Sequence, residues 1–359
     1  MNKIFAHADP DGLVSALFTE YGTGIKTVIF PADFGDTTGI KDGDWMVDMR
    51  PIENKGGITV IDHHLDHPEK PKYKLIWDYV PASLISFRYF KDKIPKNEWW
   101  KTSIGIVGDA QPELIPYEIF KQCPSLLRNY KTSARQSYGK WNLYSYPLYK
   151  LVSSPLNALC KMREEEKAYK ILKEVKSPME LITNDECLHA KSIVNAEVEK
   201  VIQNCEGSEY DNLIVIIYSS KYKINGHVAS VLANAYPNKT IMVINRYDNA
   251  LSIRGDLAIF YKETLSKYLD YVECGGHCFD EKTEVLTDEG FKYFKDLTGD
   301  ELIYSLNPFT HEIELLKPVD YIDIPYNGKM IHFKGKYVDL MVTPNHKIPY
   351  ITDWKYRHS

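Results

Sequence analysis

Residues 3–12 of the chain read KIFAHADPDG, and this stretch decides the fold. The letters KIFA read as a buried strand, after which His7, Asp9 and Asp11 follow on alternate residues. Because alternate residues of an extended segment point the same way, these three side chains can face one site. Gly12 then allows the chain to turn into a helix. The stretch therefore predicts a strand, a polar loop and a helix, the opening unit of an α/β fold.

Three later segments also place polar residues directly after an apolar run. MVDMR carries Asp48, TVIDHH carries Asp62, His63 and His64, and SIGIVGDA carries Asp109. In open parallel sheets, ligands bind beyond the carboxyl ends of the strands. We therefore expect the polar side chains of all four segments to meet at one edge of a sheet.

The first third of the chain alternates short apolar strands with helical stretches, which predicts a parallel sheet in an α/β fold. The expected strands cover residues 3–7, 27–30, 45–48 and 58–61, and the expected helices cover 12–21, 82–90 and 98–106. A second, smaller α/β lobe follows, with strands at 213–218, 240–244 and 250–254 and a helix at 226–235. From residue 278 onward, short strands and turns indicate an all-β domain.

The mixture of carboxylates and imidazoles predicts a site for divalent metal ions, with Mn²⁺ favoured and Mg²⁺ or Co²⁺ as alternatives. Crowded carboxylates repel one another unless cations lie between them. Two ions roughly 3.5–4 Å apart can activate water and stabilise the leaving oxygen of an in-line displacement. This is the chemistry of phosphoester hydrolysis, so we expect an enzyme with two metal ions.

HADPDG, the aspartate of VDMR, DHH and GDA resemble the four motifs of the DHH phosphoesterase family. That family includes RecJ-like exonucleases, oligoribonucleases, cyclic-dinucleotide phosphodiesterases, exopolyphosphatases and family II pyrophosphatases. The resemblance implies two metal sites that share Asp48. One ion would be held by His7, Asp9 and Asp48, and the other by Asp11, Asp48, His63 and Asp109.

The resemblance also implies catalytic roles for Asp62 and His64. His64 would contact the substrate phosphate, and Asp62 would orient a neighbouring histidine rather than bind metal. Asp66 and His67 follow closely in the sequence but match no motif position, and we expect both to be solvated.

The second lobe resembles the DHH-associated substrate domain of the RecJ-like branch. The matching pieces are Arg254 at the end of a strand and the run Gly275, Gly276 and His277. The glycines let the backbone approach a phosphate closely, and the two cationic side chains can bind its oxygens. This lobe disfavours a pyrophosphatase and favours a nucleotide, a short oligonucleotide or single-stranded nucleic acid as the substrate. A cyclic dinucleotide stays open as an alternative.

Residues 121–150 are basic and aromatic, and they allow two interpretations. The tyrosines and the tryptophan could stack on the bases of single-stranded nucleic acid while lysines and arginines steer it. Alternatively, the stretch is a surface excursion with half-buried tyrosines.

The family pattern is interrupted after His277, where the chain continues CFDEKTEVLTDEG. This segment resembles the opening block of an intein of the Hint type, and TPNH at 343–346 resembles the second splicing block. The resemblance implies that the Cys278 thiol attacks the His277 carbonyl, that His346 protonates the departing amide nitrogen and that Thr343 positions the scissile bond. No terminal His-Asn block precedes Ser359, so we expect that the chain as given cannot complete splicing. A gene fragment, an engineered fragment and one half of a split intein all stay open, and in the last case a C-terminal intein half would be the partner.

We divide the chain into four regions on these grounds. Residues 1–150 form the DHH catalytic domain, 151–208 a charged helical connector, 209–277 a truncated substrate-binding lobe and 278–359 the N-terminal part of an intein splicing domain.

Bulk composition limits the remaining choices. The 359 residues carry a formal net charge of −5, which argues against a chain-wide electrostatic grip on nucleic acid. None of the six cysteines forms a Cys-x-x-Cys pair, so we expect a reducing, cytoplasmic setting. The longest apolar runs are far too short to span a bilayer, and no membrane partner is expected.

Two readings compete with the phosphoesterase. Autoprocessing could be the relevant activity of this polypeptide, with the phosphoesterase inactive until splicing. A binding module with a degenerate site is disfavoured because no ligand position is missing. The sequence leaves the exact substrate and the oligomeric state open, and a homodimer is compatible with it.

Overall fold

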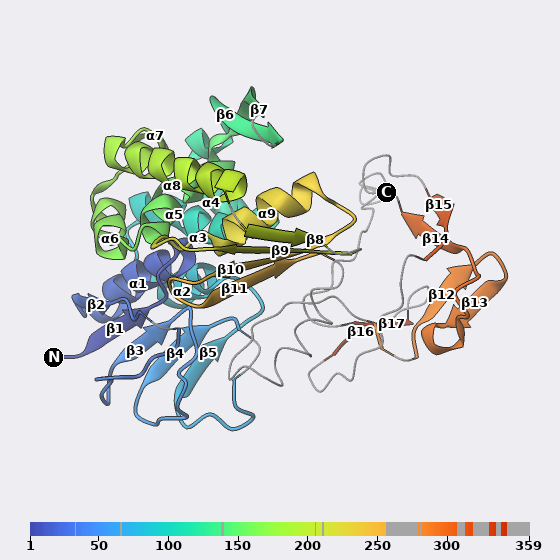
Figure 1. Cartoon of the computed structure of the whole chain (residues 1–359). Coiled ribbons are helices and arrows are strands. Elements are labelled where there is room, and N and C mark those ends of the chain that lie inside the picture. Colours follow the sequence, from blue (N-terminus) through green and yellow to red (C-terminus); the bar gives the residue numbers. More distant parts are fainter. Residues whose placement is uncertain are drawn as a thin grey trace, which may run out of the picture. The chain divides into compact units, whose positions relative to one another are not determined.

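The computed structural model describes residues 1–32, 34–64, 67–137, 140–204, 206–209, 212–255, 279–280, 282–306, 313–318, 330–334 and 339–342. The chain divides into two compact units, Met1–Gly255 and Asp256–Ser359. Figure 1 shows the elements of both units, coloured along the sequence.

A five-stranded parallel sheet forms the N-terminal part of the first unit. Its strands are β1 (Lys3–Ala6), β2 (Thr27–Ile29), β3 (Trp45–Val47), β4 (Thr59–Asp62) and β5 (Lys74–Trp77), in the order β2-β1-β3-β4-β5. The predicted parallel sheet is confirmed, each predicted strand lies within one residue of its expected bounds, and β5 is additional. The strand order reverses between β1 and β3, the place where α/β sheets bind ligands.

The two faces of this sheet bury different side chains. Ile4, Val47 and Ile61 contribute to the main core, which they share with the helices. Their sequence neighbours point to the opposite face, because side chains alternate along a strand. That face carries a smaller cluster made of Phe5, Ile40, Met46, Met49, Ile58, Val60 and Tyr73.

Helices cover the main-core face of the sheet. They are α1 (Pro10–Thr23), α2 (Ala82–Phe90), α3 (Thr102–Gly108) and α4 (Tyr117–Gln122). The helix expected over 98–106 is divided, with a 3₁₀ segment at Lys96–Lys101 leading into α3. Helix α1 packs against both α2 and α3, and it also contacts strands β1 and β3.

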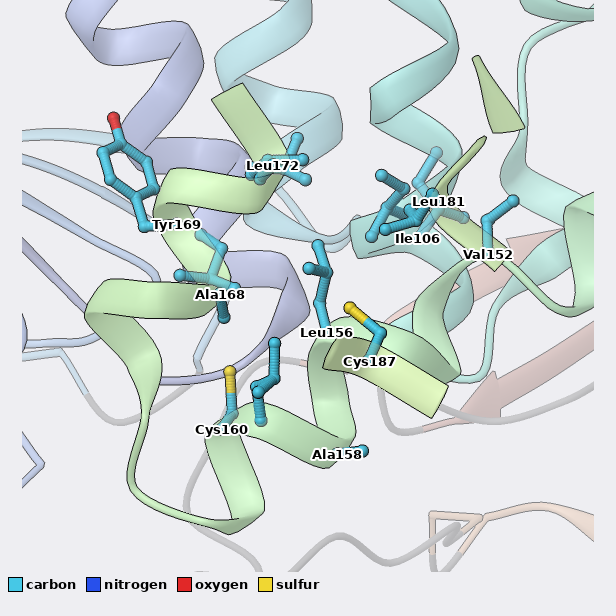
Figure 2. Close-up of a cluster of buried hydrophobic side chains, with 14 of the residues drawn as sticks. Ile106, Val152, Leu156, Ala158, Cys160, Ala168, Tyr169, Leu172, Leu181 and Cys187 are labelled. Carbon is cyan, nitrogen blue, oxygen red and sulfur yellow. The ribbon is translucent and has the colours of Figure 1, made fainter. Parts of the chain in front are cut away.

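The connector consists of α5 (Ser153–Lys161), α6 (Glu165–Glu174), α7 (Pro178–Ile182) and α8 (Asp185–Asn204). The predicted helical character is confirmed. Figure 2 shows Leu156, Cys160, Ala168, Leu172 and Cys187 of these helices among the buried side chains of the main core. The connector is therefore packed onto the first sheet's helices rather than being a loose linker.

Residues 121–150 contain a β-hairpin, which the sequence did not predict. It pairs β6 (Asn129–Ser137) with β7 (Lys140–Pro147). Tyr130 lies opposite Tyr146 and Thr132 lies opposite Tyr144, so the three tyrosines share one face of the hairpin. All three are half-buried, which fits the surface excursion, and stacking on nucleic acid stays a prediction.

The second lobe is a mixed sheet with the order β11-β10-β9-β8. Strands β9 (Leu213–Tyr218) and β10 (Thr240–Asn245) are parallel, whereas β8 (Glu206–Glu209) and β11 (Ala250–Arg254) are antiparallel to their neighbours. Helix α9 (Asn225–Ala235) packs on β10 and β11. The predicted strands and helix are present, and β8 is additional.

The second unit consists, in its described residues, of short antiparallel strands and one 3₁₀ turn at Phe294–Asp296. Strands β12 (Glu284–Thr287), β13 (Gly290–Tyr293), β14 (Ile303–Leu306) and β15 (Ile313–Leu316) form one sheet, and β16 (Ile331–Lys334) pairs with β17 (Asp339–Val342). These strands are compatible with the predicted all-β domain. Across both units, the part of the chain that is described contains no helix long and apolar enough to cross a membrane.

Candidate metal centre

Contacts among its own residues fix the conformation of the loop between β1 and α1. Asp9 precedes α1 with an extended conformation, and its Oδ1 accepts a hydrogen bond of 2.9 Å from the Gly12 amide. A Cβ placed on Gly12 would lie 2.2 Å from the His7 carbonyl oxygen, so only glycine fits there. The loop therefore holds His7 and Asp9 close to the start of the helix.

Asp11 is buried and caps a different helix from its own. Its Oδ2 accepts a hydrogen bond of 2.7 Å from the Ala82 amide, and its Oδ1 accepts one of 3.0 Å from the Ser83 amide. Helix α2 follows Pro81 and has no capping side chain from its own segment. Asp11 therefore fills the N-terminus of α2 across a long sequence separation, and both elements are held in place.

Asp48 follows β3 with a left-handed backbone, at a φ of 57°. Its amide donates to the Ile61 carbonyl at 2.8 Å, so the residue still belongs to the ladder between β3 and β4. Its carboxylate lies between two histidines, with Oδ2 3.4 Å from His7 Nδ1 and Oδ1 3.3 Å from His63 Nε2. Left-handed conformations of non-glycine residues cost energy and concentrate at functional sites.

Asp62, the last residue of β4, supports the two histidines that follow it. Its Oδ1 accepts a hydrogen bond of 2.8 Å from the His63 amide and lies 2.6 Å from His64 Nδ1. The His64 carbonyl accepts a further bond of 2.8 Å from Trp77 Nε1. The ring of His64 is thus held on one side by a buried carboxylate.

Asp109 ends α3, and its amide donates to Gly105 at 3.0 Å. The next residue, Ala110, turns into the left-handed region at a φ of 56°, as is common beyond a helix C-terminus. Asp109 Oδ2 lies 3.4 Å from His63 Nε2. The fourth predicted segment therefore reaches the same place as the other three.

The structure brings the predicted N-terminal ligands into three overlapping groups, each with ligand atoms within 4.8 Å of one another. The groups are His7, Asp9 and Asp48; Asp11, His63 and Asp109; and Asp48, Asp62, His63 and His64. The first group has the same residues as the first expected set. The second group has three of the four residues of the second expected set, and the fourth, Asp48, is grouped with His63 in the third group.

Burial and like charges act together on the carboxylates. Burial, and then Asp9 and Asp11, raise the pKa of Asp48 well above its usual value. Burial, and then Asp11 and Asp48, do the same to the pKa of Asp109. Burial lowers the pKa of His7, but Asp9 and Asp48 outweigh it and raise that pKa well above its usual value. The metal-free cluster therefore favours protonated forms of Asp48, Asp109 and His7.

Two features of the site fit divalent cations: unpaired buried carboxylate oxygens and a mixture of oxygen and imidazole donors. Asp48 Oδ2 and Asp109 Oδ2 are buried and accept no hydrogen bond from the described residues. Unpaired buried carboxylate oxygens are costly, and a cation relieves both the desolvation and the mutual repulsion. Oxygen and imidazole donors together suit Mn²⁺ and related ions.

The expectation that His67 is solvated is wrong. Its side chain is 7% exposed, because Nε2 lies 3.0 Å from Asp62 Oδ2 and Nδ1 lies 2.7 Å from the Tyr73 hydroxyl. The only sequence signal was its closeness to DHH, which a motif comparison disregards. Asp66 lies outside the described residues.

Phe34 is a second residue of the site that sequence reasoning missed. Its ring meets the rings of His7 and His64 edge-on, with centroids 5.2 Å and 5.1 Å away. Phe34 lies in the loop after β2 and has no local sequence signal, because its proximity depends on how that loop folds back over the strand ends.

The substrate-lobe and splicing residues are only partly described. Arg254 ends β11 and is exposed, and a Cβ placed on Gly226 at the start of α9 would lie 3.5 Å from its Nη2. The other predicted residues of these two sites lie outside the described residues; they are Gly275, Gly276, His277, Cys278, Thr343 and His346.

Comparison with known proteins supplies a fold and one short sequence match. No family model matches the chain. The ribonucleoside-diphosphate reductase subunit beta of Aquifex aeolicus (strain VF5) is 38% identical over 66 residues, which is 18% of this chain. The chain spans 10% of that protein.

Among solved structures, RecJ from Thermus thermophilus in complex with Mn²⁺ superposes with a TM-score of 0.52 at 16% identity, over 76% of this chain and 48% of that one. PggH, a pGpG-specific phosphodiesterase of Vibrio cholerae, superposes with a TM-score of 0.44 at 12% identity, over 75% of this chain and 89% of that one. The chain therefore has an α/β fold similar to that of RecJ and spans about half of that RecJ chain.

Proposed function

We propose that the chain is a two-metal phosphoesterase of the DHH type. It hydrolyses phosphodiester or phosphate bonds in nucleotides, short oligonucleotides or single-stranded nucleic acid. The observation that carries this proposal is the position of Asp48, a buried carboxylate shared between His7 and His63 at the meeting point of two ligand groups. The fold likeness to RecJ, a protein crystallised with Mn²⁺, supports the choice of ion.

The proposed ligands of the first ion are His7, Asp9 and Asp48, and those of the second are Asp11, Asp48, His63 and Asp109. When bound, two such ions activate water and stabilise the leaving oxygen. With Nδ1 held by Asp62, His64 presents its other ring nitrogen to a substrate phosphate.

The second lobe supports a phosphate-containing substrate. Arg254 lies beside the start of α9, where backbone amides carry partial positive charge. A guanidinium at a helix N-terminus is well suited to bind a phosphate. The sequence resemblance assigns a phosphate-binding role to Gly275, Gly276 and His277 as well, and these residues lie outside the described part of the chain.

The test combines metal binding with hydrolysis. Calorimetry should show Mn²⁺ binding to the purified chain, and the loaded chain should release nucleoside monophosphate from a short oligonucleotide. Asp48→Asn should weaken both binding events, because Asp48 is the shared ligand, and lower kcat on the order of 10²–10³-fold, because an electrostatic group at the reacting centre is lost. Asp92→Asn, at an exposed aspartate, is the matched control and should change neither measurement.

A cyclic dinucleotide assayed in parallel distinguishes the two substrate classes. Mn²⁺ binding without hydrolysis of any nucleotide would contradict the proposed activity.

One observation favours autoprocessing as a second candidate function. Phe279 forms an isolated antiparallel bridge with Val342, and the Asp280 amide donates to the Met341 carbonyl at 3.0 Å. Phe279 follows Cys278 in the sequence, and Val342 precedes Thr343. The pairing supports the idea that the two predicted splicing blocks work together.

Thiol treatment of the full chain tests this second function. Cleavage between His277 and Cys278 should give a fragment that ends at His277, identified by mass spectrometry. Cys278→Ala should prevent the cleavage, whereas Cys123→Ala, at a half-buried thiol, should not. Equal behaviour of the wild-type chain and Cys278→Ala would rule it out.

A further inference from the structure

A chain of four polar side chains leads from the candidate metal centre into the smaller hydrophobic cluster. His64 Nδ1 lies 2.6 Å from Asp62 Oδ1, and Asp62 Oδ2 lies 3.0 Å from His67 Nε2. His67 Nδ1 lies 2.7 Å from the Tyr73 hydroxyl. Nothing in the predicted ligand sets or in the proposed mechanism accounts for the last two members.

The donors and acceptors of this chain can be assigned in one direction. If the Tyr73 hydroxyl donates to His67 Nδ1, then the neutral ring carries its proton on Nε2, the nitrogen that lies 3.0 Å from Asp62 Oδ2. Asp62 Oδ1 in turn accepts from His64 Nδ1, so the carboxylate lies between the two imidazole rings. Burial alone would raise the pKa of Asp62, but His64 and His67 lower it below its usual value.

Tyr73, the last of these four side chains, is held in place by packing. Tyr73 is 4% exposed and belongs to the cluster that also contains Phe5, Met46 and Val60. Its ring packs edge-on against that of His67, with centroids 5.8 Å apart. The position of His67 is therefore set by the packed sheet face rather than by the loop on which it lies.

We propose that His67 is a positioning residue that fixes the Asp62 carboxylate and, through it, the ring of His64. Asp62 is fully buried, and its carboxylate can rotate unless both oxygens are engaged. The backbone amide of His63 and the ring of His64 bind Oδ1 through hydrogen bonds, whereas His67 Nε2 lies 3.0 Å from Oδ2 as a close polar contact without hydrogen-bond alignment. Without His67, the Asp62 carboxylate turns and His64 loses its fixed orientation.

This inference rests on the proposed phosphoesterase for its effect on catalysis but not for its effect on His64. The experiment therefore has two arms, one for the effect of His67 on His64 and one for its effect on catalysis. The first arm follows the ring protons of labelled histidines by NMR in the full, metal-free chain. The second arm measures kcat and KM of the Mn²⁺-loaded chain on a short oligonucleotide.

In the NMR arm, the wild-type chain should show a low-field proton from the His64 Nδ1–H bond, assigned by its loss in His64→Ala. His67→Ala should shift this signal and speed its exchange with solvent. His67→Gln, whose amide nitrogen can replace Nε2 as a donor, should keep it. His189→Ala, at an exposed histidine of α8, is the matched control.

In the kinetic arm, His67→Ala should lower kcat roughly 10–100-fold with little change in KM, as expected when a group that orients a catalytic histidine is lost. His67→Gln should recover most of this loss, and Tyr73→Phe should produce a smaller one. In a His64→Ala background, His67→Ala should cost less than about a further twofold, because the two residues act through one another.

An unchanged His64 signal in His67→Ala, or an equal loss of kcat with and without His64, would overturn the proposal. Both results would mean that His67 only stabilises its loop. If the wild-type chain binds Mn²⁺ and hydrolyses nothing, the proposed function fails, and the NMR arm still decides the role of His67.

Discussion

At the scale of single residues, the candidate metal centre disfavours the ionised forms of its carboxyl groups. Asp11, Asp48 and Asp109 have a raised pKa, caused first by burial, with neighbouring carboxylates adding to it. Asp48 also adopts a left-handed backbone, which costs on the order of 1–3 kcal/mol. These costs make sense for a site whose partners are cations, because each disfavoured group becomes a ligand when an ion arrives.

Asp109→Asn should stabilise the metal-free protein while it removes metal binding. A carboxyl whose pKa is raised on folding contributes stability below its unfolded pKa and loses it as pH rises through the raised value. At neutral pH the substitution should therefore raise the free energy of unfolding by about 1 kcal/mol, a typical gain when a strained functional group is relieved. Urea unfolding with chelator present measures this gain, which should vanish in acid. A loss of stability at neutral pH would contradict it.

Mn²⁺ affinity should increase with pH. Protons on His7 and on the crowded carboxylates must leave before an ion binds, because their raised pKa values keep them protonated. The affinity should rise as pH passes through the raised pKa of His7 and then level off. Calorimetry in two buffers of different ionisation enthalpy would detect the released protons. A pH-independent affinity with no proton release would show that the ligands are already deprotonated.

At the scale of secondary-structure elements, the site depends on how three helices meet. Asp11 starts in α1, caps the N-terminus of α2 and faces α3. A Cβ placed on Gly105 of α3 would lie 2.3 Å from Ser83 Oγ and 2.5 Å from Asp11 Oδ1. The absence of a side chain at this position therefore lets α3 approach the metal centre.

Gly105→Ala should displace Asp11 and weaken the second metal site. The added methyl should cost roughly 1–3 kcal/mol of stability, as overpacking does in a dense interior, in spite of the better helix propensity of alanine. Thermal unfolding and Mn²⁺ calorimetry would measure the two effects. Gly56→Ala is the matched control, because its nearest neighbour would lie 3.6 Å away. If both substitutions behave alike, the close approach at Gly105 is not required.

At the scale of the whole molecule, the metal ligands and the β-rich C-terminal segment belong to different compact units. All three ligand groups lie within Met1–Gly255. In the second unit, Val342 is buried, whereas Phe291 and Ile313 are 68% and 72% exposed. Because the ligand groups lie in the first unit, a bound metal ion should stabilise that unit against unfolding and leave the stability of the second unit unchanged.

Scanning calorimetry should resolve two unfolding transitions, of which Mn²⁺ raises only the one that belongs to the first unit. An ion present at a hundred times its Kd stabilises the folded state by about 2.7 kcal/mol. At roughly 2–4 °C per kcal/mol for a domain of this size, Tm should rise by about 5–10 °C. Asp48→Asn should lose this shift. A single transition, or an equal shift of both, would mean that the units unfold together.

The sequence by itself predicted strands β1 to β4 and β9 to β11 and the candidate N-terminal ligands, but it did not predict β5, β8 or the hairpin of β6 and β7. The predicted features follow from apolar periodicity and from polar residues at strand ends, which act over a few residues. Only the tertiary structure decided that Asp11 caps α2, that Phe34 reaches His7 and His64, and that His67 lies between Asp62 and Tyr73. These contacts join segments whose closeness depends on packing of the whole unit, so no local pattern of residues carries them.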